Sequence, residues 1–102
     1  MKLSIKDGVS LLGVQPQMML AAVVVAGVYD NLNNAECVIT SGTEGNHMDH
    51  SHHLKGLALD FRIRNVRQGW HVQLQQKAQA ALGSEFQTSL SAINLHVEFD
   101  PK

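Results

Sequence analysis

Two histidines and one aspartate are placed where they could hold a metal ion together. His53 and Asp60 belong to the segment 51–60, which reads SHHLKGLALD, and His96 lies in the segment LHVEF near the end of the chain. Two imidazoles and one carboxylate suit a catalytic zinc ion with one position left for water. Zinc lowers the pKa of its bound water to about 7, which supplies hydroxide at neutral pH. We therefore expect one Zn²⁺ per chain, for which Co²⁺, Ni²⁺ or Mn²⁺ can substitute in vitro.

The hydrophobic pattern around these residues predicts two strands that present them on one face. Between Leu57 and Ile63 apolar side chains alternate with Ala58, Asp60 and Arg62, and the last segment alternates in the same way. Successive side chains of a strand point to opposite faces, so Asp60 and His96 share a face if both strands belong to one sheet. His53 would reach them from the loop before the first strand. The expected buried faces hold Leu57, Leu59, Phe61 and Ile63, and Ile93, Leu95, Val97 and Phe99.

Three further polar residues are candidates for roles at this centre. Glu98 shares the predicted face of His96, about 7 Å along the strand, and could act as general base or be a carboxylate that only orients a ligand or lies in solvent. His47, in a loop rich in histidine, is a candidate proton carrier or donor to an oxyanion, while His50 and His52 are expected to turn outward. Arg62 could bind a substrate carboxylate through two hydrogen bonds, or form an ion pair with Glu98 or Asp60.

Length and composition predict a single globular domain covering residues 1–102. The chain is 44% hydrophobic and has a formal net charge of −1. A chain of this size forms one modest core, and its near-neutral charge gives no electrostatic argument for nucleic acid or an anionic membrane as partner. The longest apolar run covers only residues 18–28, whereas a membrane span needs about 20 residues. The polar residues after the start do not fit a signal peptide, so we expect synthesis in the cytoplasm.

Periodicity along the chain predicts an α+β fold. One helix is expected from Pro16 to about Leu32, and a second from Gly69 to Leu82 with Gly83 as its C-terminal cap. The first should bury Met19, Ala22, Val23, Ala26 and Tyr29, and the second should turn its glutamines toward solvent. Strands are expected over 36–41, 57–63, 86–90 and 94–99, with a short strand or arm over 1–5 and a polar loop over 42–55. This order predicts a mainly antiparallel sheet with helices on one face and the metal site on the other.

One motif resembles the signature of a known peptidase family. The pattern Ser-x-His-x-x-Gly-x-Ala-x-Asp is met at Ser51, His53, Gly56, Ala58 and Asp60, and it resembles the signature of the zinc D-alanyl-D-alanine carboxypeptidase family. That family shares a superfamily with murein endopeptidases, phage L-alanyl-D-glutamate endolysins and the hedgehog signalling domain. The segments 38–47 (VITSGTEGNH) and 96–102 (HVEFDPK) resemble a small single-domain subgroup common in phage genomes, so the similarity covers most of the chain.

The resemblance implies a function as well as a fold. It implies a hedgehog-like domain with zinc held by His53, Asp60 and His96, and cleavage of peptide bonds in bacterial peptidoglycan stem peptides. Ser51, a fixed position of the motif, joins Arg62 as a candidate for substrate binding. A phage-encoded protein of this kind would act on the cell wall after lysis or release.

The chain departs from the resembled pattern just before His96. In much of the family the last motif reads His-x-His or Glu-x-x-His, and the upstream residue acts as general base or stabilises the transition state. Here Asn94 and Ile93 occupy those positions, and neither side chain accepts a proton from water. Three alternatives to a peptidase therefore stay open. They are a metal-binding relative without activity that binds cell wall or a protein, a structural metal whose fourth ligand is His47 or His50, and polar residues on a solvated sheet.

Overall fold

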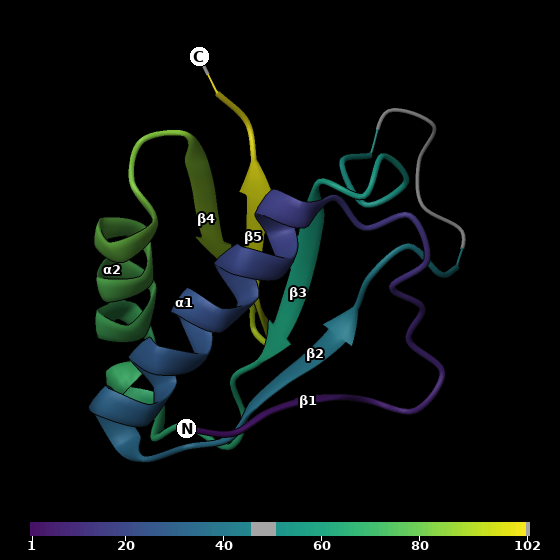
Figure 1. Cartoon of the computed structure of the whole chain (residues 1–102). Coiled ribbons are helices and arrows are strands. Elements are labelled where there is room, and N and C mark those ends of the chain that lie inside the picture. Colours follow the sequence, from purple (N-terminus) through teal and green to yellow (C-terminus); the bar gives the residue numbers. More distant parts are fainter. Residues whose placement is uncertain (46–50, 102) are drawn as a thin grey trace.

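The elements expected from the sequence are present, with boundaries close to those predicted. The computed structural model describes residues 1–45 and 51–101 (Figure 1). In these residues the chain forms β1 (Leu3–Ile5), α1 (Pro16–Asn33), β2 (Cys37–Ser41), β3 (Ala58–Arg62), a short 3₁₀ helix η1 (Gln68–Trp70), α2 (His71–Leu82), β4 (Phe86–Leu90) and β5 (Asn94–Phe99). The α+β class is confirmed. No helix in the described ranges is both long and apolar enough to cross a membrane.

The strands form one mixed sheet in the order β1-β2-β3-β5-β4. Strands β2, β3, β5 and β4 are antiparallel to their neighbours in that series, whereas β1 is parallel to β2. The expectation of a mainly antiparallel sheet therefore holds for β2 to β5 and does not extend to β1. The physical reason is the connection, because α1 lies between β1 and β2 and a helical crossover returns the chain in its original direction.

The register between β3 and β5 determines which side chains share a face. Asp60 lies directly opposite His96, and Leu59 lies opposite Val97. Leu59, Val97 and their neighbour Phe61 are fully buried, whereas Asp60 and His96 point to the other face. A slip of one residue would move every side chain of the strand to the wrong face, so burial of the apolar set fixes this register.

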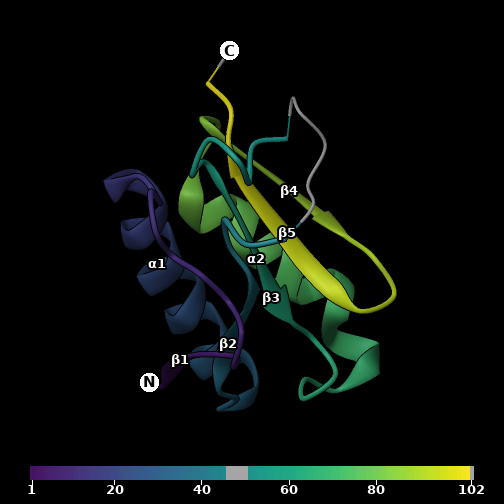
Figure 2. The ribbon, with the colours of Figure 1, turned by 90° about the vertical axis from the view of Figure 1, so that its right-hand side faces the viewer.

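Both helices cover the apolar face of the sheet (Figures 1 and 2). Side chains of α1, α2 and the central strands form one hydrophobic core, which includes Met18, Val25, Leu59, Phe61, Leu74 and Leu95. The polar face, which carries Asp60 and His96, has no helix of the described chain packed on it. As predicted, the helices cover one face of the sheet, while Asp60 and His96 lie on the other.

Three details of the predicted faces are wrong. In α1 the buried stripe contains Met18 and Val25, whereas Val23, which was expected to be buried, is 48% exposed. Residues 18–28 are apolar throughout, so no polar side marks which stripe faces the core. Ile93 was expected on the buried face but is 71% exposed, because β5 begins only at Asn94. The glutamines of α2 were expected in solvent, but two of them, Gln75 and Gln79, bond to Thr88 of β4.

A tight turn before β3 delivers His53 to the polar face. Within it the Gly56 N–H donates to the His53 carbonyl (3.1 Å) and the Leu57 N–H to the His52 carbonyl (2.8 Å). Gly56 has φ +72°, and a Cβ at this position would lie 2.0 Å from the carbonyl oxygen of Gly13. The Gln15 N–H also donates to the Gly56 carbonyl (2.9 Å). Only glycine fits here, because both the backbone conformation and the close approach exclude a side chain.

Replacing Gly56 with alanine should destabilise the protein more than the same change at Gly83. Gly83 has φ +91° and ψ 179° and nothing within 4 Å of its would-be Cβ, so Gly83→Ala carries only the cost of a backbone conformation that is essentially confined to glycine, about 1–3 kcal/mol. Gly56→Ala adds a collision with backbone, which we expect to cost about 1–3 kcal/mol more. Urea unfolding of both variants measures the difference, and equal losses would contradict the role of the close approach.

Candidate metal centre

His53, Asp60 and His96 converge on the polar face of the sheet, as the sequence predicted. The His53 Nε2 lies 3.3 Å from Asp60 Oδ2, and the His96 Nδ1 lies 2.7 Å from Asp60 Oδ1. One nitrogen or oxygen from each residue lies within 4.8 Å of the others. His53 is buried, at 6% exposure, and the other two are partly buried. The donor set and its spacing are compatible with one zinc ion held by three protein ligands.

The backbone orients the His53 imidazole for metal binding. Its Nδ1 lies 2.9 Å from the carbonyl oxygen of Gly42, to which it can only donate. That contact assigns the proton to Nδ1 and leaves Nε2 as the nitrogen that is available to a metal. The His53 N–H donates to the Ser51 hydroxyl (3.1 Å). Ser51, a candidate for substrate binding, is therefore engaged in shaping the turn.

Glu98 lies against the second histidine. Its Oε1 is 2.8 Å from the His96 Nε2, while the Nδ1 of that ring faces Asp60. A carboxylate that accepts the outer N–H of a metal-binding histidine fixes the ring and strengthens it as a ligand. Of the two roles that the sequence left open for Glu98, this contact favours orientation of His96.

His52 folds back onto the same carboxylate, although it was expected to turn outward. Its Nε2 lies 3.6 Å from Glu98 Oε2 and 3.8 Å from Asp100 Oδ1. The Glu98 carboxylate thus lies between two imidazoles, with one oxygen toward His96 and the other toward His52. His52, Glu98 and Asp100 form a second group of possible metal ligands. The adjacent residues His52 and His53 contact different carboxylates, those of Glu98 and Asp60.

The close charges shift the pKa values of the metal-free site. Burial raises the pKa of Asp60, but hydrogen bonds with His53 and His96 outweigh it and hold that pKa at about 2. The hydrogen bond with Asp60 raises the pKa of His96 above its usual range; burial opposes this shift, and Glu98 reinforces it. The metal-free site therefore keeps Asp60 ionised and favours a protonated His96. A metal ion must displace that proton when it binds.

A carboxylate that the sequence did not single out fixes the loop behind His53. Glu44 Oε1 accepts hydrogen bonds from the N–H groups of Gly42 (2.8 Å) and Ser10 (3.0 Å). Burial raises the pKa of Glu44, but these backbone donors outweigh it and lower the pKa below its usual range. The Thr43 hydroxyl also donates to the Leu12 carbonyl (2.7 Å). Glu44 thereby holds the Gly42 carbonyl that orients His53, and its only signal in the sequence was its place between two glycines.

Two of the remaining candidates, Arg62 and Asn94, occupy the next position on the same face of β3 and β5 as Asp60 and His96. Arg62 is paired with Asn94 across the strands, and among the described residues it forms no ion pair with Asp60 or Glu98. The Asn94 Oδ1 accepts a hydrogen bond from the Thr40 hydroxyl (3.1 Å), so its amide is engaged with the sheet. His47, a candidate for proton transfer, lies outside the described residues.

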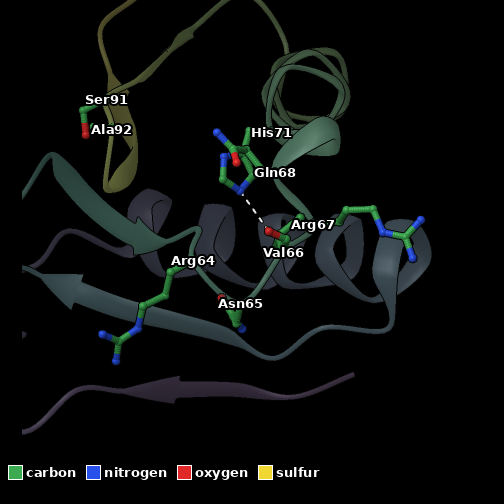
Figure 3. A pocket seen from close by; sticks show the side chains of 8 residues that line it. All are labelled: Arg64, Asn65, Val66, Arg67, Gln68, His71, Ser91 and Ala92. Carbon is green, nitrogen blue, oxygen red and sulfur yellow. Dashed lines mark hydrogen bonds between the residues drawn. The ribbon is translucent and has the colours of Figure 1, made fainter.

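His71 is remote from the candidate metal centre and has a structural role. It lines a pocket between the start of α2 and the turn after β3, whose volume is about 600 Å³. Figure 3 shows the lining residues. The His71 Nε2 lies 2.8 Å from the Ile63 carbonyl oxygen and 2.9 Å from that of Val66. These contacts tie α2 to the end of β3.

Comparisons with known proteins leave the family resemblance untested. The chain matches no protein-family model, no curated protein and no solved structure. The peptidase family therefore stays a prediction.

Substituting the ligands should abolish tight zinc binding, while substituting His71 should not. We expect His53→Ala and His96→Ala each to weaken zinc binding by about 100-fold or more, and Glu98→Gln by about 10-fold, because it loses only the contact that orients His96. His71→Ala is the matched control, since its ring contacts only backbone carbonyls. Competition with a chromophoric chelator measures the affinities, and an equal loss in His71→Ala would contradict this assignment.

Without metal, the contact between Asp60 and His96 should stabilise the fold most in mildly acidic solution. The pKa of Asp60 falls from 3.8 to about 2 on folding, so its contribution is present above about pH 4 and lost as the pH falls toward 2. The pKa of His96 rises above 6.5, so its contribution is present below that pH and lost as the pH rises through the raised value. Asp60→Asn should therefore lower the free energy of unfolding by about 2 kcal/mol near pH 5.5.

The same substitution should cost less at a pH above the raised pKa of His96, where the imidazole is neutral. Urea unfolding of chelator-treated wild type and Asp60→Asn, at the mildly acidic and at the alkaline pH, measures the difference in free energy of unfolding under each condition. A loss that is the same at both would show that the two residues do not interact through charge.

Proposed function

We propose that the protein is a zinc-dependent peptidase that cleaves peptide bonds in peptidoglycan stem peptides. The observation that carries the proposal is the convergence of His53, Asp60 and His96, with each imidazole oriented by an acceptor on its other nitrogen. Three protein ligands and an open position are typical of catalytic zinc sites. The motif of residues 51–60 supports the choice of peptide substrates, a hedgehog-like fold, and action on the cell wall after lysis or release of a phage.

The residues around the ligands would have different roles at such a site. A bound zinc ion would supply Lewis acidity, which polarises a carbonyl and lowers the pKa of bound water. The Gly42 carbonyl holds the proton on His53 Nδ1, and Glu98 Oε1 holds the proton on His96 Nε2. Among the described residues, Glu98 and His52 lie beside the ligands, with 3.6 Å between Oε2 of Glu98 and Nε2 of His52. They are candidates for proton transfer together with His47.

A metal-binding relative without catalytic activity is the second candidate, and Asn94 favours it. This residue occupies the position where the resembled family places a base, and its Oδ1 accepts a hydrogen bond from Thr40. An amide cannot act as a general base at neutral pH. A protein of this kind would bind zinc and recognise cell wall or a protein partner without turnover.

Zinc-loaded protein should release stem-peptide fragments from purified peptidoglycan. We expect chelation to stop the release, and Asp60→Ala to reduce it by about 100-fold or more because a ligand is lost. His71→Ala, which lies outside the centre, should retain activity. Chromatography of the released fragments measures the rate. Stoichiometric zinc with no release from wild type would contradict the peptidase and favour the binding protein.

Introducing a base at position 94 separates the two candidates. If the natural protein is inactive, Asn94→His should raise release from near zero, because it returns a proton acceptor to the face of His96. If Glu98 and His52 already transfer protons, the same change should have little effect, whereas Glu98→Gln should lower the rate by about 10- to 100-fold. Ile93→Glu is the control, because that side chain lies outside β5 and is 71% exposed. Rates are compared at equal zinc occupancy.

A further inference from the structure

A second feature of the polar sheet face is a basic pocket at the far end of β3 from His53. The pocket has a volume of about 450 Å³ and is lined by Lys6, Thr40, Arg62, Arg64, Ile93 and Asn94, together with Ala92. Its walls come from the segment after β1, the end of β3 and the turn between β4 and β5. It lies on the same face as the metal centre, because Arg62 follows Asp60 by two residues along β3.

The positive charge of this pocket is not balanced within the described chain. Three cationic side chains, Lys6, Arg62 and Arg64, line it, and no acidic side chain of the described residues does. None of the three belongs to an ion pair of residues 1–45 and 51–101. Figure 3 shows the Arg64 side chain extending away from Gln68 and His71. On a protein of net charge −1, three unpaired cations at one pocket indicate a site for an anion.

The distance between the pocket and the metal centre limits where that anion can lie in a substrate. The backbone positions of Asp60 and Arg62 are separated by about 7 Å along the strand. A carboxylate on the residue next to the scissile bond lies only about 4 Å from the reacting carbonyl carbon, whereas two extended residues span about 7 Å. The pocket therefore fits a carboxylate about two residues from the bond at the metal centre.

We propose that the pocket of Lys6, Arg62 and Arg64 binds a substrate carboxylate about two residues from the scissile bond. This inference rests on the proposed peptidase function and favours cleavage two residues from a carboxylate over removal of a single C-terminal residue. Arg62 is the central residue, because it alone of the three shares a strand with the ligand Asp60. Its guanidinium can bind a carboxylate through two parallel hydrogen bonds, and the exposed Lys6 and Arg64 add charge at the rim.

Calorimetry of the metal-free full chain with matched peptides tests the proposal without turnover. The probe is the stem peptide L-Ala-γ-D-Glu-L-Lys-D-Ala-D-Ala, compared with analogues that carry an amide at the D-Glu α-carboxylate, at the C-terminus, or at both. We expect the peptide with both carboxylates to bind about 10- to 100-fold more tightly than the double amide. The single amides identify which carboxylate the pocket recognises.

Three variants test which side chains contribute to binding of the acid peptide. Arg62→Gln and Arg64→Gln should weaken the acid peptide and leave the double amide unchanged, so that the preference shrinks. Lys77→Gln is the matched control, because Lys77 is exposed on α2, on the other side of the sheet. Equal affinity for acid and amide peptides in wild type would overturn the proposal, as would an equal loss in Lys77→Gln. Tighter binding of a single-stranded DNA oligonucleotide that also depends on Arg62 would overturn it in favour of a phosphate site.

Kinetics with zinc separate this proposal from the proposed function. If the loaded protein cleaves the peptide, Arg62→Gln should raise KM for the acid peptide more than it lowers kcat, and an unchanged KM would overturn the pocket alone. If the loaded protein cleaves nothing while acid peptides still bind through Arg62, the peptidase fails and the carboxylate site stands as a binding site.

Discussion

The pairing of Asp60 with His96 across β3 and β5 is the constraint on which the rest of the structure depends. It places a carboxylate and an imidazole side by side on one face, while Leu59 and Val97 are buried on the other. The hydrophobic effect sets this register, since a slip of one residue would expose the apolar set and bury the polar one. The geometry of the metal centre is therefore maintained by the core beneath it.

The third ligand depends on a different kind of support. His53 lies in a turn rather than in the sheet, and its position is transmitted through hydrogen bonds from Glu44 to Gly42 and from Gly42 to the imidazole. The segment before α1 holds both sides of this loop through Ser10 and Gln15. The segment before α1, which is far from His53 in the sequence, thus helps to orient the His53 imidazole.

The sequence was informative where side chains repeat with the period of a strand or helix. Alternation predicted β3 and β5 and placed Asp60 and His96 on one face, because the period of two is a direct consequence of strand geometry. It failed for α1, whose continuous apolar run does not mark a face, and for β1, whose direction depends on the crossover through α1. Glu44, Lys6 and Arg64 carry no such periodic signal, since loops and turns bring them to their places. The orientation of His53 could not be foreseen either, because its partner is a backbone carbonyl.

The ionic contact between Asp60 and His96 has a consequence for the pH dependence of metal binding. A proton on His96 supplies positive charge beside Asp60, at the place where a metal ion would supply it. If zinc binds as proposed, it would have to displace this proton. A fall in pH would then weaken binding, because protons compete with the ion for the imidazole nitrogens. The contact that joins Asp60 to His96 would thus also make occupancy of the candidate centre sensitive to acidity.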